Sequence, residues 1–304
     1  MSNWLWLLML AALWSPSFLF IKLALVDVPP LTLAATRLTL AAMMLAGVLY
    51  LRGERLPRRW EVWRKFFFMG FFANALPFAL FSLGELVADS GMAAILNGTT
   101  PIFTVILAHF FISDERLNGQ KLGGVLIGFA GIVLLFAPEV QGNWARGGSV
   151  WGLVAFAVAA MSYGIGIVYA RRNLRGLPPL VGPAAQLTMA SVWLLPVALW
   201  VERPFGIRPG LPAIGSLLAL AVFGTALAFM LYYHLIERAS ATFLSLVTYI
   251  LPPAGLLLGV VFLDESPGWQ AVVGCGLIIV GVMVVNGAIG AAWQRWVQPS
   301  PVSG

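Results

Sequence analysis

Ten long, mostly apolar stretches follow one another along this chain, and they restrict its fold more than any other feature of the sequence. A helix needs about 20 such residues to cross the hydrocarbon core of a bilayer. The stretches lack the alternation of apolar and polar residues that is typical of membrane β-strands. They cover residues 4–25, 31–51, 66–86, 91–112, 121–138, 150–171, 180–201, 213–236, 241–263 and 269–290. We therefore expect an all-α polytopic membrane protein with ten transmembrane helices.

The amino-acid composition excludes a water-soluble protein. Of the 304 residues, 60% are hydrophobic and 10% are charged, whereas soluble domains average about 45–50% apolar and about 25% charged residues. The net charge of +6 does not indicate a nucleic-acid partner, because the basic residues lie in short loops between the apolar stretches. The single cysteine, Cys275, allows no disulfide framework or cysteine-based metal site within one chain. We expect the lipid bilayer as surroundings, and neither cofactor nor metal.

The positions of lysine and arginine predict the orientation in the membrane. With ten spans, both termini and the even-numbered loops share one side. Basic residues accumulate in cytoplasmic loops. The shared side carries thirteen of them: Arg52, Arg55, Arg58, Arg59, Arg64, Lys65, Arg116, Lys121, Arg171, Arg172, Arg175, Arg238 and Arg295. The opposite side carries three: Arg146, Arg203 and Arg208. Both termini are therefore expected in the cytoplasm, and the first stretch, which lacks a basic n-region, is expected to be a membrane helix and not a cleaved signal peptide.

A sequence pattern that occurs twice predicts two related halves. "SDERLNGQKLGGVLIGFAG" from Ser113 returns as "LDESPGWQAVVGCGLIIVG" from Leu263, and "PPLTLAATRLTLAA" from Pro29 corresponds to "PPLVGPAAQLTMAS" from Pro178. We expect a first five-helix repeat at 1–149, a second at 150–298 and a tail at 299–304. Because five is odd, the second repeat enters the membrane from the other side. Inverted repeats of this kind are typical of transporters that work by alternating access.

The motifs "AALWSPSFLFIKLAL" and "AAILNGTTPIFTVILAHFFISDERLNGQKLGGVLIGFAGIVLL", with Arg37 after a proline-rich turn, resemble the EamA-type transporters of the drug/metabolite transporter superfamily. The resemblance covers the whole chain and extends to the YddG-like bacterial amino-acid exporters. It implies a ten-helix transporter of the bacterial inner membrane that exports small metabolites through a central cavity. The chain departs from the family pattern at Gln186, which stands where the first half has Arg37, and at Trp14, which Ser-Pro follows in place of Gly-Ser. Both departures leave the substrate class open.

Prolines near the middle of two spans predict where the cavity lies. Pro101 is in the fourth span and Pro252-Pro253 in the ninth, at corresponding positions of the two halves. A proline removes a backbone hydrogen bond and kinks a helix, and broken spans in matching positions indicate a binding site at the midplane. The alternative is that these prolines only shape the packing of the helices.

Polar and aromatic residues at the same depth are the candidate substrate-binding residues. An amide or hydroxyl that faces lipid costs free energy, so these groups are expected to face the interior of the bundle. The alternative is interhelical hydrogen bonding, which contributes about 0.6–2 kcal/mol per contact. The candidates are Trp14, Ser15, Asn74, Phe78, Asn97, Thr100, Tyr163, Thr248 and Tyr249.

Charged residues restrict the substrate. A carrier of phosphorylated sugars should place Lys or Arg at the midplane, yet Lys22 is near a span end. Arg37 is the only cation that could reach inward; structural support or snorkelling is expected of it, with substrate contact as the alternative. A neutral or zwitterionic solute, such as an amino acid (aromatic ones included), fits better. Glu85, Asp89, His109 and His234 lie toward span ends, so we expect transport without an obligatory ion. A proton-coupled exporter of another substrate class is the alternative.

Other protein classes fit the sequence less well. An intramembrane enzyme needs a nucleophile with a base, or a metal cluster, at one depth, and the sequence offers no such set. The acidic pairs Asp114-Glu115 and Asp264-Glu265 each precede a helix, and their negative charge is expected to stabilise its N-terminus. A channel would not need the inverted repeat. No span has a face that suggests a subunit interface, so we expect a monomer.

Overall fold

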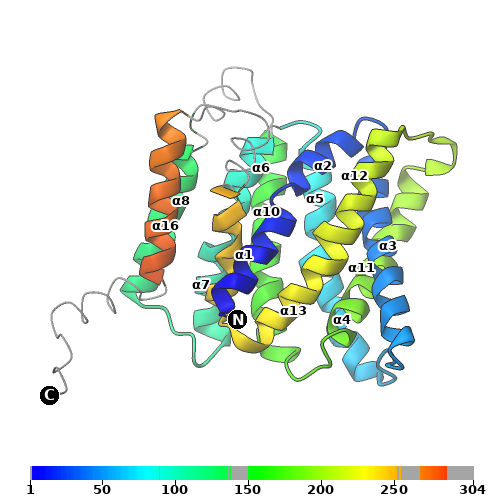
Figure 1. Ribbon diagram of the computed structural model, residues 1–304, viewed down its shortest axis with the longest axis horizontal. Helices are drawn as coiled ribbons and strands as arrows, with labels where there is room; N and C mark the ends of the chain where they lie inside the picture. Colours follow the sequence, from blue (N-terminus) through cyan, green and yellow to red (C-terminus); the bar gives the residue numbers. More distant parts are fainter. Residues whose placement is uncertain are drawn as a thin grey trace, which may run out of the picture.

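The computed structural model describes residues 2–88, 90–135, 137, 150–251, 253–254 and 268–285. All regular secondary structure in these residues is helical. The helices run side by side, upright in Figure 1, and form a bundle with the N terminus at its lower end. The multi-pass, all-helical arrangement expected from the apolar stretches is therefore present in the described part of the chain.

The bundle is built from the following elements. Up to residue 135 they are α1 (Asn3–Trp14), α2 (Ser17–Ala24), α3 (Pro30–Leu51), α4 (Trp60–Gly70), the π-helical η1 (Phe71–Ala75), α5 (Leu76–Gly84), α6 (Ser90–Asn97), α7 (Thr100–Phe111) and α8 (Gly119–Leu135). From residue 150 they are α10 (Val150–Asn173), α11 (Val181–Val201), the short 3₁₀ helix η2 (Pro204–Gly206), α12 (Leu211–Ala221), the π-helical η3 (Val222–Leu227), α13 (Ala228–Arg238), α14 (Ala241–Ser245) and α16 (Trp269–Val285).

Seven helical segments in the described residues are long and apolar enough to cross a membrane: Asn3–Ala24, Pro30–Leu51, Trp60–Gly84, Met92–Phe111, Val150–Asn173, Val181–Val201 and Leu211–Arg238. Three shorter apolar helices, Gly119–Leu135, Ala241–Leu251 and Val272–Val285, lie at the predicted fifth, ninth and tenth spans. These three adjoin residues outside the described part, so the count of ten spans stays a prediction.

The third span begins earlier than the apolar pattern predicts. The sequence places its start at residue 66, whereas α4 begins at Trp60. The charged residues 61, 64 and 65 interrupt the apolar run without ending the helix, because a helix can expose one polar face to water. The indole N–H of Trp63 donates to the backbone oxygen of Pro57 at 2.7 Å and ties this first turn to the preceding loop.

Two of the predicted spans are each divided into two helices. The first span is interrupted at Ser15-Pro16, between α1 and α2, since Pro16 has no backbone N–H to donate to the preceding turn. The fourth span is interrupted between α6 and α7, and Pro101 lies in the first turn of α7. A proline is tolerated there because the first N–H groups of a helix have no intrahelical partner. In the ninth span, a turn at Leu246 follows α14 and Pro253 lies further along; Pro252 is outside the described residues.

The third and eighth spans each contain a π-helical segment near the middle. η1 separates α4 from α5, and η3 separates α12 from α13. Such segments are rare and often lie at functional sites. Their sequence positions correspond: Phe78 follows η1 as Phe229 follows η3. The two spans therefore share an irregularity that the apolar pattern alone does not reveal.

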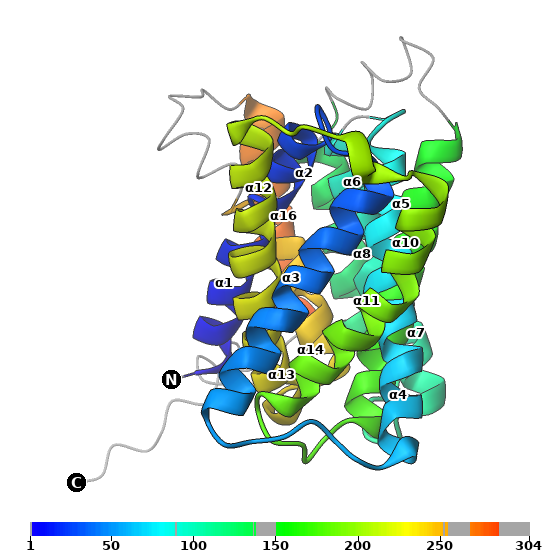
Figure 2. The same ribbon diagram turned by 90° about the vertical axis from the view of Figure 1, so that its right-hand side faces the viewer.

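Two helix pairs bring distant parts of the sequence together. α3 packs along α11, as Figure 2 shows, and α8 packs along α16. A Cβ atom added at Gly124 would lie 2.7 Å from the backbone nitrogen of Val285, and one at Gly131 would lie 2.8 Å from the backbone nitrogen of Ile278. Real Cβ atoms do not approach backbone so closely. Glycine at these positions thus allows α8 and α16 to touch backbone to backbone, as small-residue spacing does in membrane helices.

Candidate functional site

A cavity of about 110 Å³ lies among the helices. Its lining comes from the predicted spans one, two, three, four, six, eight and nine. The lining residues are Trp14, Ser17, Phe18, Ile21, Arg37, Ala73, Phe78, Phe81, Asn97, Thr100, Tyr163, Ile167, Phe229, Tyr232, Leu244, Val247, Thr248 and Leu251. The volume is several times the space that one water molecule needs, so the cavity can hold part of a small solute.

The structure brings six of the nine candidate residues together on this cavity. They are Trp14, Phe78, Asn97, Thr100, Tyr163 and Thr248. The break between α6 and α7 presents Asn97 and Thr100 from the two sides of one turn. The helix break at Pro101 and the polar lining of the cavity thus belong to the same local feature.

The other three candidates lie behind the cavity wall. The Ser15 hydroxyl lies 2.7 Å from the backbone oxygen of Ala11 and 3.3 Å from that of Leu251, and its single hydrogen can be donated to either. Asn74 is fully buried and accepts a hydrogen bond from the side-chain amide of Gln186. Tyr249 is also fully buried, and its hydroxyl donates to the backbone oxygen of Val125 in α8 at 2.6 Å. All three join one helix to another or one turn to the next.

Aromatic rings form much of the wall. The ring centroids of Phe81 and Tyr163 lie 6.0 Å apart in a stacked arrangement, and those of Trp14 and Phe229 lie 6.1 Å apart edge to face. Sequence reasoning missed Phe81, Phe229 and Tyr232. A signal for Phe229 existed, because it occupies the position in the second half that Phe78 occupies in the first. Such a wall suits an apolar or aromatic body.

Three polar atoms of the wall lack a hydrogen-bond partner among the described residues. They are Ser17 Oγ, Asn97 Oδ1 and Thr100 Oγ1. Asn97 is 6% exposed and Thr100 is fully buried. A buried polar atom without a partner costs about 1–3 kcal/mol. Such atoms at a cavity therefore indicate places where a solute can supply the missing hydrogen bond.

Arg37 lines the cavity instead of acting only from a span end. It is 5% exposed. Its Nε and Nη2 atoms donate to Thr225 Oγ1 at 3.2 and 3.1 Å, and Nη2 also approaches the oxygen of Gly224 at 3.5 Å. The guanidinium carbon lies 4.3 Å from the ring centroid of Phe78. The expected structural support is present in these bonds. Arg37 also reaches the cavity, as the sequence left open, because the η3 segment provides acceptors for it in the bundle interior.

The acidic and histidine side chains near the span ends do not form one cluster in the described residues. Glu85 is 7% exposed at the C-terminal end of α5 and interacts electrostatically with Arg37. His109 accepts from the backbone N–H of Leu117, and His234 contacts Arg238. Asp89 lies outside the described residues. In the part of the chain that the structure describes, no three His, Cys, Asp or Glu side chains are placed to hold a metal ion.

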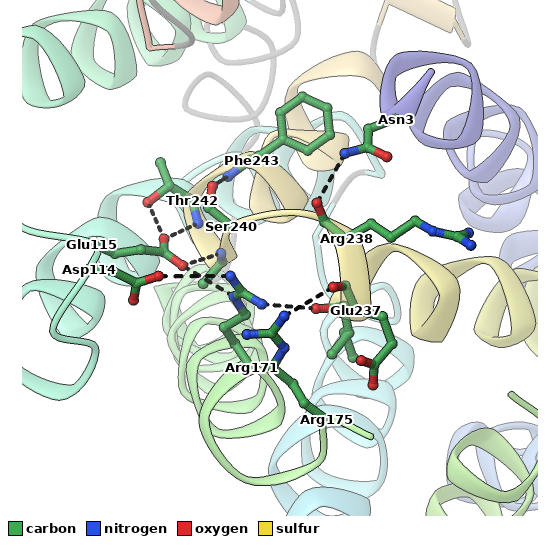
Figure 3. A network of polar contacts seen from close by, with 12 residues as sticks. Asn3, Asp114, Glu115, Arg171, Arg175, Glu237, Arg238, Ser240, Thr242 and Phe243 are labelled. Atoms are coloured by element: carbon green, nitrogen blue, oxygen red, sulfur yellow. Dashed lines mark hydrogen bonds and ion pairs between the residues drawn. The ribbon is translucent and has the colours of Figure 1, made fainter. Parts of the chain in front are cut away.

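A polar network joins the helices at the lower end of the bundle. Glu115 is 3% exposed and accepts from the backbone N–H groups of Ala241 and Thr242 at 2.7 and 3.0 Å. Arg171 lies beside it, with Nε 3.6 Å from Glu115 Oε1 and Nη2 4.0 Å from Asp114 Oδ2. Figure 3 shows these side chains together. The network connects the loop after α7 with the end of α10 and the start of α14.

Comparison with known proteins identifies relatives along nearly the whole chain. The model of the EamA-like transporter family matches twice, at residues 2–137 and 150–287. An uncharacterized transporter of Archaeoglobus fulgidus is 26% identical over 94% of this chain and 99% of its own length. The uncharacterized inner membrane transporter YedA of Escherichia coli is 26% identical over 90% of this chain and 87% of its own. Protein PecM of Dickeya dadantii is 28% identical over 79% of both chains.

A crystal structure of another protein has the same fold, with a TM-score of 0.75 at 24% identity over 94% of this chain and 98% of that chain. The helical bundle, its interior cavity and the two family matches agree with one another. The chain belongs to the EamA-like transporter family and is a multi-pass membrane transporter of small molecules.

Proposed function

We propose that the protein exports small neutral or zwitterionic metabolites, namely amino acids, with aromatic and hydrophobic ones included. The observation that carries this proposal is the cavity, which combines aromatic walls with buried polar atoms that lack a partner among the described residues. An amino acid supplies donors, acceptors and an apolar body in one small molecule. Trp14, Phe78, Asn97, Thr100, Tyr163 and Thr248 contact it, whereas Ser15, Asn74 and Tyr249 support the wall from behind.

The proposal includes the architecture of ten helices in two inverted five-helix repeats. It is supported by the family model, which matches each half once, and by the π-helical segments at corresponding positions of the third and eighth spans. Two buried side-chain pairs add to this support. Arg37 donates to Thr225, and Gln186 donates to Asn74; Arg37 and Gln186 correspond in the repeat, as do Thr225 and Asn74.

Placement of the protein is part of the same proposal: the inner membrane, both termini in the cytoplasm, and a monomer as the working unit. The relative YedA is named as an inner membrane transporter. The basic residues that predict the orientation include Arg171, Arg175 and Arg238, which lie near Asn3 in Figure 3, so that these basic residues and the N-terminal end of α1 share one side. Fusion of a reporter that is active only in the cytoplasm to each terminus tests the orientation.

The transport cycle is alternating access, in which the cavity opens to one side at a time. At the lower end, Glu115 of the first half holds Ala241 and Thr242 of the second. At the upper end, Glu202 of the second half accepts from the backbone N–H groups of Leu31 and Thr32 at 2.9 and 2.7 Å. Contacts between the halves at both ends can be broken in turn as the halves rock against each other.

Transport follows the substrate gradient without an obligatory ion. The alternative, proton coupling, is favoured by one observation, the buried Glu85 that interacts electrostatically with Arg37. A carboxyl group in such a place can take up and release a proton. Purified protein in liposomes, given only a proton gradient, distinguishes the two: uphill movement of substrate that Glu85→Gln abolishes would establish the alternative.

Counterflow tests the substrate class. Liposomes that hold purified protein are loaded with an unlabelled amino acid and given a labelled trace outside. A carrier takes up label only when the amino acid is present inside, and uptake saturates. Uptake should fall when Trp14 or Asn97 is replaced, since both line the cavity. Absence of counterflow across the set of amino acids would overturn the proposed substrate class.

A further inference from the structure

The η3 segment of the eighth span creates a polar corner in the cavity. The backbone oxygen of Gly224 accepts from the indole N–H of Trp14 at 3.0 Å and lies 3.5 Å from Arg37 Nη2. Thr225 Oγ1 accepts from Arg37 and itself donates to the backbone oxygen of Leu220 at 2.8 Å. The guanidinium is therefore held by neutral acceptors on its Nε and Nη2 side. Its Nη1 group makes no hydrogen bond within the described residues.

A second observation places another donor at this corner. A Cβ atom added to Gly224 would lie 3.2 Å from Ser17 Oγ and 3.6 Å from Arg37 Nη2. Ser17 and Arg37 thus flank the same small space, which glycine keeps open. Ser17 Oγ is buried and has no partner among the described residues. A hydroxyl and a guanidinium that face one space are a suitable donor set for an anionic oxygen pair.

The charge of Arg37 supports the same conclusion. A buried cation is stable when an opposite charge compensates it. Its hydrogen bonds go to a hydroxyl and a carbonyl, which are neutral. Glu85 acts on it electrostatically and is not part of the cavity lining. A carboxylate that enters the cavity would pair with Arg37 directly, in a setting of low dielectric where charge-assisted bonds are strong.

We propose that Arg37 and Ser17 form a carboxylate-binding subsite, and that this subsite restricts the cavity to solutes that combine one carboxylate with an apolar or aromatic body. The carboxylate binds at the η3 corner, and the body lies against the rings of Phe78, Tyr163 and Phe229. Asn97 Oδ1, another polar atom of the wall without a partner among the described residues, receives a donor such as an ammonium group. The inference rests on the proposed function and names the group by which the substrate is selected.

The repeat supplies a variant designed to keep the fold. Gln186 of the second half and Asn74 of the first half form the pair that corresponds to Arg37 and Thr225. The double variant Arg37→Gln/Thr225→Asn copies that pair onto the positions of Arg37 and Thr225 and removes the charge. Ser17→Ala removes the second donor alone. Thermal unfolding of both variants shows whether they are folded before any binding is compared.

The test compares phenylalanine with phenylalanine amide and with 3-phenylpropanoate, a carboxylate without an ammonium group. Each competes with labelled phenylalanine in counterflow, and each is also added to detergent-solubilised protein in a thermal-stabilisation assay. The protein should bind both carboxylates in preference to the amide. In Arg37→Gln/Thr225→Asn, the affinity for both carboxylates should fall roughly tenfold or more, whereas the affinity for the amide should change little. Ser17→Ala should have a smaller effect of the same kind.

The two assays separate the inference from the proposed function. If phenylalanine and its amide bind equally, or if the double variant keeps the preference for carboxylates, the subsite is overturned while amino-acid transport stands. If no amino acid shows counterflow but 3-phenylpropanoate stabilises the protein and the double variant loses that effect, the subsite stands and the proposed substrate class fails. If no carboxylate is transported or stabilises the protein, both are overturned.

Discussion

The carboxylate of Glu115 accepts two hydrogen bonds from Thr242, one from the backbone N–H at 3.0 Å and one from the hydroxyl at 3.1 Å. Glu115 follows α7, and Thr242 is in the first turn of α14, 127 residues later in the chain. The first N–H groups of a helix have no intrahelical partner, and a negative charge is favourable beside them. This contact therefore joins the two halves of the chain by satisfying the start of a helix.

Replacement of Glu115 by glutamine is expected to weaken the lower end of the bundle. Glutamine keeps one acceptor oxygen but loses the charge, so an N–H group of Ala241 or Thr242 loses its partner and Arg171 loses the nearer and more buried of its two carboxylate partners. We expect the free energy of unfolding to fall by about 1–3 kcal/mol, the cost of a buried group left without its bond. Thermal unfolding in detergent measures the loss.

The neighbouring residue provides the control for this prediction. Asp114 has a 70% exposed side chain that lies 4.0 Å from Arg171, and exposed ion pairs contribute about 0–1 kcal/mol. Asp114→Asn should leave the unfolding temperature nearly unchanged. Equal effects of Glu115→Gln and Asp114→Asn would show that the cap on α14 does not hold the two halves together.

The buried pair of Asn74 and Gln186 should show measurable coupling. The Gln186 amide donates to Asn74 and accepts from the hydroxyl of Tyr233 at 2.6 Å. A double-mutant cycle with Asn74→Ala and Gln186→Ala is expected to give a coupling energy of about 0.6–1.7 kcal/mol, the range measured between helices in membranes. Tyr233→Phe serves as a reference, because it removes one bond and leaves the pair intact. A coupling energy of zero would mean that the pair contributes nothing to helix association.

The positions of the helices could be predicted because the thickness of the bilayer sets the length of apolar sequence that each span needs. Trp60 marks the limit of this reasoning, since α4 begins six residues before the predicted apolar span at 66. The π-helical segments were not predictable from apolar content, because Phe71–Ala75 and Val222–Leu227 are as apolar as regular spans. They shift the register of the helix, and only the packing of neighbouring side chains reveals them.

The depth of the candidate residues could be predicted, but not the direction in which each one points. Tyr163 and Tyr249 illustrate this, since both are mid-span tyrosines in the sequence. Tyr163 lines the cavity, whereas Tyr249 packs against α8 and donates to Val125. The direction depends on how each helix is rotated about its axis. This rotation changes at the breaks at Pro16 and Pro101 and at the η1 and η3 segments. For the same reason the sequence left an inward-reaching Arg37 only as an alternative, because the acceptors that hold Arg37 at the cavity exist only once η3 has formed.

Alanine at Gly124 is expected to disrupt the contact between α8 and α16. The added Cβ would lie 2.7 Å from the backbone nitrogen of Val285, and overpacking of this kind costs about 1–3 kcal/mol. The adjacent Gly123 is the matched control, since a Cβ there meets nothing within 4 Å. Gly123→Ala should be neutral or slightly stabilising, because alanine forms helix better than glycine. If both variants unfold at the same temperature, close packing of the two backbones is not required for stability.

Substitutions of two threonines one turn apart in α7 distinguish an effect on substrate binding from an effect on stability. Thr100 lines the cavity and its hydroxyl has no partner among the described residues. Thr104 is equally buried, but its hydroxyl donates to the backbone oxygen of Thr100 at 2.8 Å. Thr100→Val removes a polar atom whose burial is uncompensated, so the protein should unfold at the same or a higher temperature, while the KM for amino-acid counterflow rises because the substrate loses a hydrogen bond.

Thr104→Val should act in the opposite way. It removes a satisfied hydrogen bond away from the cavity, so the free energy of unfolding should fall by about 0.5–1.5 kcal/mol with KM unchanged. The comparison depends on the sign of each effect, and both substitutions keep the shape of the side chain. A stability loss in Thr100→Val that equals that of Thr104→Val, with KM unchanged, would assign Thr100 to packing. The expected outcome is a higher KM without loss of stability in Thr100→Val, and a loss of stability without change of KM in Thr104→Val. That outcome would place the substrate against the turn between α6 and α7, at the centre of the fourth span.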